Sequence, residues 1–189
     1  RFLKGFKGNN YIKSAYQKLS WIAFLQDKSD EEMSYFEKIK LEGRAFIDED
    51  KVALKEAENN HMNSPKLLRA RLLYDGGYYE KAHLELAREN NSSDYAGFFD
   101  EYYYRLARIK SKLKYLDEQV IAQYQTAFDL GGESSNYYAP MSALQIGLIY
   151  EKQNNFNQAK IYFEKCLSLS DFDYERGIHQ KAKVGLVRV

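Results

Sequence analysis

Apolar and polar positions recur at helical spacing in two consecutive segments between Ser142 and Leu169. Gln153, Asn154 and Asn155 form a polar turn between the segments, and apolar residues spaced three and four apart predict an amphipathic helix on each side. Gly147 and Ala159 stand 12 positions apart, one in each segment. Small side chains let two helices approach closely while larger neighbours fill the space between them. The stretch therefore predicts a helical hairpin. Its apolar and small positions are Ala143, Ile146, Gly147 and Tyr150, then Phe156, Ala159, Phe163, Cys166 and Leu167.

The same spacing of small residues recurs earlier in the chain. Ala70 and Ala82 are again 12 positions apart, on either side of a turn that contains Gly76 and Gly77. Ala107 pairs with Val120, which makes the turn of that pair one residue longer. A structural unit that recurs at similar intervals is typical of repeat architectures. The sequence therefore predicts several helix pairs in succession.

These patterns predict one continuous helical-repeat domain over residues 1–189. Asp30 is the predicted N-cap of the second helix of the first pair, and Asp48 is that of the extra helix, because an aspartate side chain accepts hydrogen bonds from free N–H groups. The predicted pairs cover residues 11–43, 64–90, 98–129 and 139–169, with an extra helix at 48–60 and a capping helix at 174–188.

The pair at 139–169 resembles the tetratricopeptide repeat, a helix-turn-helix unit of about 34 residues. Ala143, Gly147, Tyr150, Ala159 and Phe163 fall where that repeat has its characteristic residues. The second pair is similar, although Arg69 stands where an apolar residue is usual, and the third and first pairs match more loosely. The resemblance implies an all-α, right-handed superhelix of helical hairpins. It also implies that the chain is a C-terminal or internal part of a longer protein of this kind.

In proteins that this chain resembles, the first helices of successive pairs line a concave groove that holds a peptide or partner segment. Three arginines beside aromatic rings are suited to hold a carboxylate or an acidic segment by paired hydrogen bonds and stacking. An equally weighted alternative is that these arginines are solvated or paired with Glu101 and Glu151. Carrying the register over puts these residues on the groove surface: Arg71, Tyr74, Tyr104, Arg105, Arg108, Gln145, Leu148 and Glu151.

The balance of charge argues against a nucleic-acid partner. The chain has 28 basic and 27 acidic residues that are mixed along its length, so no broad basic field is available for a phosphate backbone. No apolar run approaches the roughly 20 residues that a membrane-spanning helix needs. The chain begins at Arg1, which suggests a fragment or a processed form. The compartment therefore stays open: cytoplasmic, or periplasmic or secreted if a signal peptide was removed.

The residues that usually carry catalysis or bind metals are sparse. His61, His83 and His179 are far apart and have no metal-ligand spacing between them. Cys166 lies on the apolar side of its helix, where a buried small residue is favoured over a reactive thiol. The sequence therefore predicts no catalytic, metal or cofactor site, and the protein is not expected to be an enzyme.

The pattern as a whole predicts a non-catalytic interaction module that binds a protein or peptide partner, acidic in character, in its groove. The alternative is a structural subunit whose groove is filled by its own N-terminal part or by self-association.

Overall fold

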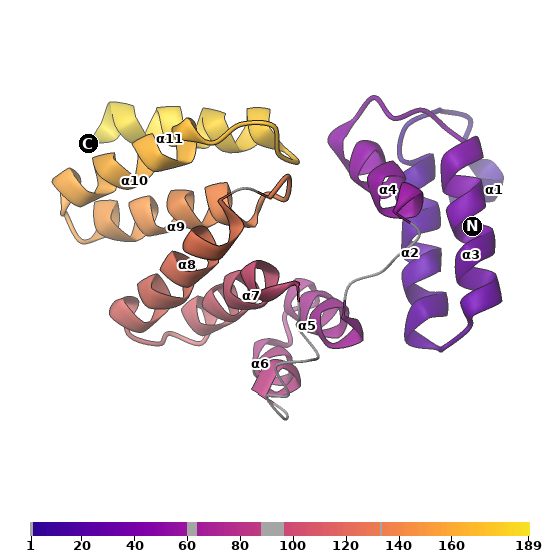
Figure 1. Cartoon of the computed structure of the whole chain (residues 1–189), viewed down its shortest axis with the longest axis horizontal. Coiled ribbons are helices and arrows are strands. Elements are labelled where there is room, and N and C mark those ends of the chain that lie inside the picture. The colour runs from indigo at the N-terminus through magenta and orange to yellow at the C-terminus, as the bar shows by residue number, and fades with distance from the viewer. Residues whose placement is uncertain (1, 60–63, 88–96, 133) are drawn as a thin grey trace. The chain divides into compact units, whose positions relative to one another are not determined.

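The computed structural model describes residues 2–59, 64–87, 97–132 and 134–189, and the regular structure within these ranges is helical (Figure 1). The ends of the predicted extra helix at 48–60 and of the predicted pair at 64–90 lie outside the described residues. The helices are α1 (Phe2–Gly5), α2 (Ile12–Leu25), α3 (Ser29–Leu41), α4 (Asp48–Glu58), α5 (Pro65–Asp75), α6 (Tyr79–Ala87), α7 (Phe99–Lys112), α8 (Asp117–Gly131), α9 (Tyr138–Lys152), α10 (Phe156–Ser168) and α11 (Glu175–Arg188).

The chain divides into two compact units, residues 1–68 and residues 69–189, and the boundary falls inside α5. The all-α helical-repeat fold that the sequence predicts is confirmed. The single continuous domain and the right-handed superhelix stay predictions.

Unit 1 is organised around the pairing of α2 with α3, and α4 packs on both helices. Its core contains the side chains of Trp21, Phe36 and Ile39, with the small Ala53 and Ala57 presented by α4. Because alanine side chains are short, α4 contributes little apolar area, and polar contacts hold it in place as well.

Asp50 of α4 is fully buried and accepts hydrogen bonds from two backbone N–H groups at the start of α2. They come from Tyr11, at 2.6 Å, and Ser14, at 2.9 Å. Tyr11 has a left-handed backbone (φ 66°), which is uncommon for a residue with a Cβ. In the first turn of α2, the buried Lys13 ammonium donates to the carbonyl oxygens of Ile39 and Lys40 near the end of α3. Burial lowers the pKa of Lys13. Side chains of α2 and α4 therefore satisfy backbone groups that helix ends leave open.

Unit 2 contains α6 to α11 and the residues of α5 from Arg69 onward. Each helix from α7 to α11 packs against the next one in the chain, so that α7 pairs with α8, and α9 with α10 (Figure 1). One buried cluster joins α7, α8 and α9, and includes Tyr104, Ala107 and Val120. A second cluster joins α9, α10 and α11 around Phe163. Ala107 and Val120 therefore meet in the core, where the sequence pairs them.

The Phe163 ring is a tight packing point of unit 2. A Cβ added at Gly147 of α9 would lie 2.6 Å from this ring, and a Cβ added at Gly185 of α11 would also lie 2.6 Å from it. Phe163 and Ala159 are both completely buried. The ring fits only because two different helices present a glycine to it.

Two capping predictions are wrong. The helix α3 begins at Ser29 with Lys28 at its N-cap, and α4 begins at Asp48 with Ile47 at its N-cap. Asp30 and Asp48 therefore lie inside the first turns, where a carboxylate is favoured by the positive end of the helix dipole. Aspartate is common both at N-cap positions and in the first turn of a helix, so its presence alone does not distinguish the two.

Candidate functional site

The arginines and tyrosines of the second and third predicted pairs come together where α5 and α7 meet. Arg71 and Tyr74 lie three positions apart on α5, and Arg105 and Arg108 lie three positions apart on α7, so each pair shares one helix face. All four line a hollow that is too narrow for a water molecule. The arrangement offers a contact surface instead of a pocket that could enclose a ligand.

Arg108 is held by aromatic rings. Its guanidinium carbon lies 4.1 Å from the centre of the Tyr74 ring and 5.6 Å from that of Tyr104. Within the described ranges, no carboxylate forms an ion pair with Arg108. Contact with the face of a tyrosine ring stabilises the planar guanidinium cation. Its N–H groups point away from the ring and can donate to a carboxylate at the same time.

Arg71 lies beside this stack and is partly exposed. Its Nε atom is 3.9 Å from an Asp75 carboxylate oxygen, at the limit of an ion pair, and 29% of its side chain is exposed. The Tyr74 ring in turn packs at a tilt against the ring of Tyr79 of α6, with 5.2 Å between the ring centres. The Tyr74 ring is thus fixed from both sides, which fixes the position of Arg108.

Arg105 does not lie on an open surface, contrary to its place in the predicted groove. Its side chain is 4% exposed and donates to the Glu101 carboxylate through Nε at 2.6 Å, while its Nη2 atom lies 2.5 Å from the same oxygen. The Tyr138 ring of α9 covers it at 5.8 Å. Burial opposes the charged form of Arg105, but Glu101, Tyr138 and Tyr137 together favour it, and the pKa of Arg105 is raised. This is the pairing that the alternative interpretation proposed for Arg105.

Tyr104 is also buried, with 4% of its surface exposed, where the sequence placed it on the groove. Its ring packs against those of Tyr124, Tyr137 and Tyr138 at 5.4 to 6.1 Å between centres. Burial raises the pKa of its hydroxyl, so the side chain stays neutral. The Tyr104 ring helps to position Arg108, but because Tyr104 is buried it is not available to bind a ligand.

The three groove residues predicted on α9 are half-buried and stand apart from the arginines. Leu148 packs on the core around Phe163. The side-chain amide nitrogen of Gln145 donates to the Met141 sulfur, with 3.8 Å between the two atoms. Glu151 accepts two hydrogen bonds from Arg188 of α11, from Nη2 at 2.7 Å and from Nε at 2.5 Å. These hydrogen bonds lower the pKa of Glu151. None of the three side chains lines the hollow between α5 and α7.

The residues with catalytic or metal-binding potential do not gather in one place. Within the described ranges, no three His, Cys, Asp or Glu side chains are arranged to hold a metal ion. Burial raises the pKa of the Cys166 thiol to about 12, so the thiol is not the reactive thiolate. His179 contacts the Leu169 carbonyl oxygen, and His61 lies outside the described residues. None of the helices in those ranges is both long and apolar enough to cross a membrane.

Residues 142–173, which include most of α9 and all of α10, match the model of the tetratricopeptide repeat family. This segment of the chain is therefore similar to a tetratricopeptide repeat. Repeats of this family are generally non-catalytic and serve protein–protein interaction. No curated protein and no solved structure matches the chain significantly.

Sequence reasoning missed two features of this site. Tyr137 and Tyr138 form part of the aromatic cluster over α7, although they belong to the N-cap and the first turn of α9. Glu101 was named only as a partner, while the structure makes it the buried counter-ion of the site. The spacing of four residues between Glu101 and Arg105 indicates that the two side chains can pair on one helix face. It does not indicate that the pair is buried.

Proposed function

We propose that the chain binds an acidic segment of a partner protein on the arginine–tyrosine surface, defined as Arg71, Tyr74 and Arg108. The tetratricopeptide repeat supports a protein-interaction module in general. The observation that supports this particular surface is Arg108, whose guanidinium lies over the Tyr74 ring and near the Tyr104 ring without a carboxylate partner among the described residues. A partner carboxylate supplies the missing counter-charge.

The acidic partner follows from geometry as well as charge. Arg108 is pre-positioned by rigid rings, so binding does not have to order a flexible side chain. Arg71 lines the same hollow, and 29% of its side chain is exposed. Two guanidinium groups at one hollow suit a segment with carboxylates on neighbouring residues.

The test uses a fluorescent peptide of alternating glycine, aspartate and glutamate, with its asparagine and glutamine counterpart as the neutral probe. In the variant, Arg71→Glu is combined with Arg108→Glu. We expect this variant to bind the acidic peptide at least about tenfold more weakly, the effect of losing one charge-assisted contact. Arg105 is left unchanged because reversing a buried charge would unfold the unit.

The matched control combines Lys112→Glu with Lys114→Glu, which changes the net charge equally at exposed positions near the end of α7. We expect the control to lose less than about threefold in affinity, as for distant screened charges. An equal loss in both variants, or equal binding of the neutral peptide, would refute the proposed surface. Sedimentation of the wild type at several concentrations separates partner binding from self-association.

A further inference from the structure

A second hollow in unit 2 involves none of the residues discussed above as a predicted binding surface. It is open to solvent and has a volume of about 340 Å³. It lies between the second helices α8 and α10, and the C-terminal end of α9 closes it. We call it the tyrosine hollow and define it by the lining residues Glu118, Ile121, Gln125, Tyr150, Gln153 and Tyr162.

Two tyrosine rings form one wall and are held in place. Tyr150 of α9 and Tyr162 of α10 stack with 5.7 Å between ring centres and 28° between ring planes. The Tyr162 hydroxyl donates to the Gln125 side-chain oxygen at 2.6 Å. The Gln125 amide nitrogen in turn donates to Asp129 at 2.7 Å, which fixes the orientation of the amide. The wall is therefore ordered before any ligand arrives.

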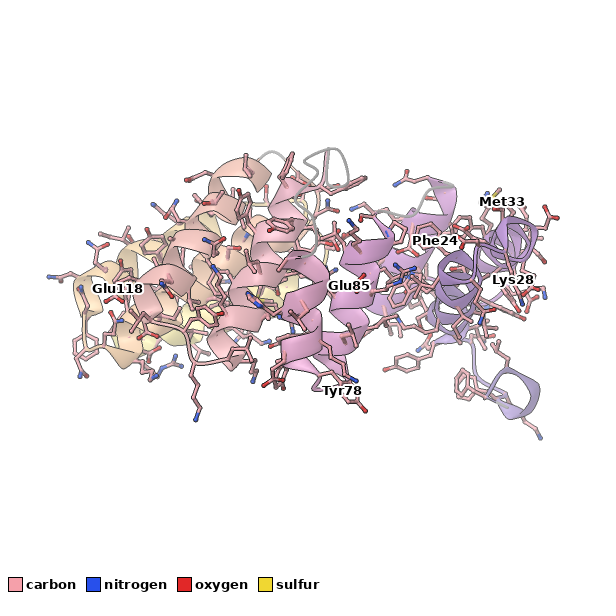
Figure 2. The ribbon with its side chains drawn as sticks, turned by 90° about the horizontal axis from the view of Figure 1, so that it is seen from below. Phe24, Lys28, Met33, Tyr78, Glu85 and Glu118 are labelled. Atoms are coloured by element: carbon pink, nitrogen blue, oxygen red, sulfur yellow. The ribbon has the colours of Figure 1, made fainter. Side chains whose placement is uncertain are left out.

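The side of the tyrosine hollow that faces the two rings is also held by a hydrogen bond. Gln153, just after α9, donates to the Asp117 carboxylate at the start of α8 with 2.9 Å between the atoms. This bond ties the two helices together at the mouth of the hollow. Glu118 is the next residue of α8 and is exposed there (Figure 2).

The charges around the tyrosine hollow favour a cation. The helix α8 carries Asp117, Glu118 and Asp129 and has no lysine or arginine. Glu118 forms no ion pair or hydrogen bond within the part of the chain that the structure describes. Tyr162 already attracts one cation, because the Lys165 ammonium lies 4.6 Å from the centre of its ring. Both the rings and the carboxylate therefore select positive charge.

We propose that the tyrosine hollow binds an arginine side chain of an extended segment of a partner protein. The guanidinium stacks on the Tyr150 ring and donates to the Glu118 carboxylate at the mouth. Arginine fits better than lysine because its flat, forked group stacks and forms two parallel hydrogen bonds at once. This site has the opposite charge preference to the arginine–tyrosine surface and shares no residue with it, so each proposal stands or fails alone.

The probe is N-acetyl-arginine amide, which has one charge and no charged ends. It is titrated into the ¹⁵N-labelled chain and followed by NMR. We expect saturable shifts of the backbone amides of Glu118, Tyr150 and Gln153. We expect the lysine analogue to bind at least about threefold more weakly, because its ammonium cannot stack on the ring. We expect the neutral citrulline analogue to bind at least about tenfold more weakly, because it has no positive charge.

The variant Glu118→Gln removes the carboxylate at an exposed position and leaves the packing unchanged. We expect it to weaken arginine binding by at least about threefold, and we expect the control Glu164→Gln, an exposed residue of α10 outside the lining, to leave binding unchanged. The proposal is overturned if both variants lose affinity equally, if citrulline binds as well as arginine, or if the shifts do not saturate and spread over all acidic side chains.

Discussion

The Phe163 ring shows how a single residue determines the spacing of helices in unit 2. The ring occupies the space that side chains of Gly147 and Gly185 would fill, so α9 and α11 both approach α10 closely. The sequence predicted the close approach of α9 and α10 from the spacing of Gly147 and Ala159. It did not predict the role of Gly185, because residues distant in sequence meet only after the third helix has packed.

Adding a methyl group at Gly147 tests this packing. Gly147→Ala puts a Cβ 2.6 Å from the ring, which overpacks the core at a cost of about 1–3 kcal/mol. The matched control is Gly177→Ala in α11, where nothing lies within 4 Å of the added Cβ. Both variants gain the same helix propensity, so we expect the control to be stabilised by up to about 1 kcal/mol. The two free energies of unfolding, measured in urea, should differ by about 1–3 kcal/mol; equal values would contradict the tight fit.

At the scale of the element, α7 combines a buried ion pair with a partly exposed stacked cation. Arg105 and Arg108 lie on one helix and have the same side chain, yet the first is covered by Tyr138 and the second is not. Sequence periodicity placed both on the same face. It could not rank their burial, because burial depends on where the start of α9 crosses α7. A site predicted from register alone therefore mixes structural and exposed residues.

Removing one member of the buried pair measures this difference. We expect Arg105→Met to lower the free energy of unfolding by about 3–5 kcal/mol, because the buried Glu101 carboxylate loses its ion pair with Arg105. Replacing both residues by methionine should cost less than Arg105→Met alone, since no charge is then left buried. The control Arg69→Met breaks the partly exposed pair with Glu85, at 3.7 Å, and should cost no more than about 1 kcal/mol. Denaturant unfolding of the four proteins checks the order, and a larger loss in the double variant would contradict it.

At the scale of the whole molecule, the sequence predicted helix pairs in succession but treated them as one array. The division at α5 depends on which buried clusters each helix joins, and helical periodicity does not reveal this. The helix α4 illustrates the difficulty. Its pattern predicted a mostly polar extra helix between repeats, whereas the structure buries Asp50 and packs the helix on α2 and α3 within unit 1. A buried carboxylate that caps a neighbouring helix looks, in sequence, like one more acidic surface residue.

The single tryptophan allows the two units to be followed separately. Trp21 is buried in the core of unit 1, so its fluorescence reports the unfolding of that unit, while far-UV circular dichroism reports the helices of both. Gly147→Ala and Arg105→Met both act on unit 2. If the two cores unfold independently, these variants shift the dichroism transition to lower urea and leave the tryptophan midpoint where it is in the wild type. The variant Trp21→Phe with Gly147→Ala serves as the control for the optical probe, because its dichroism should show the same shift. A tryptophan midpoint that moves together with the dichroism midpoint in the unit 2 variants would mean that the chain unfolds as one cooperative array.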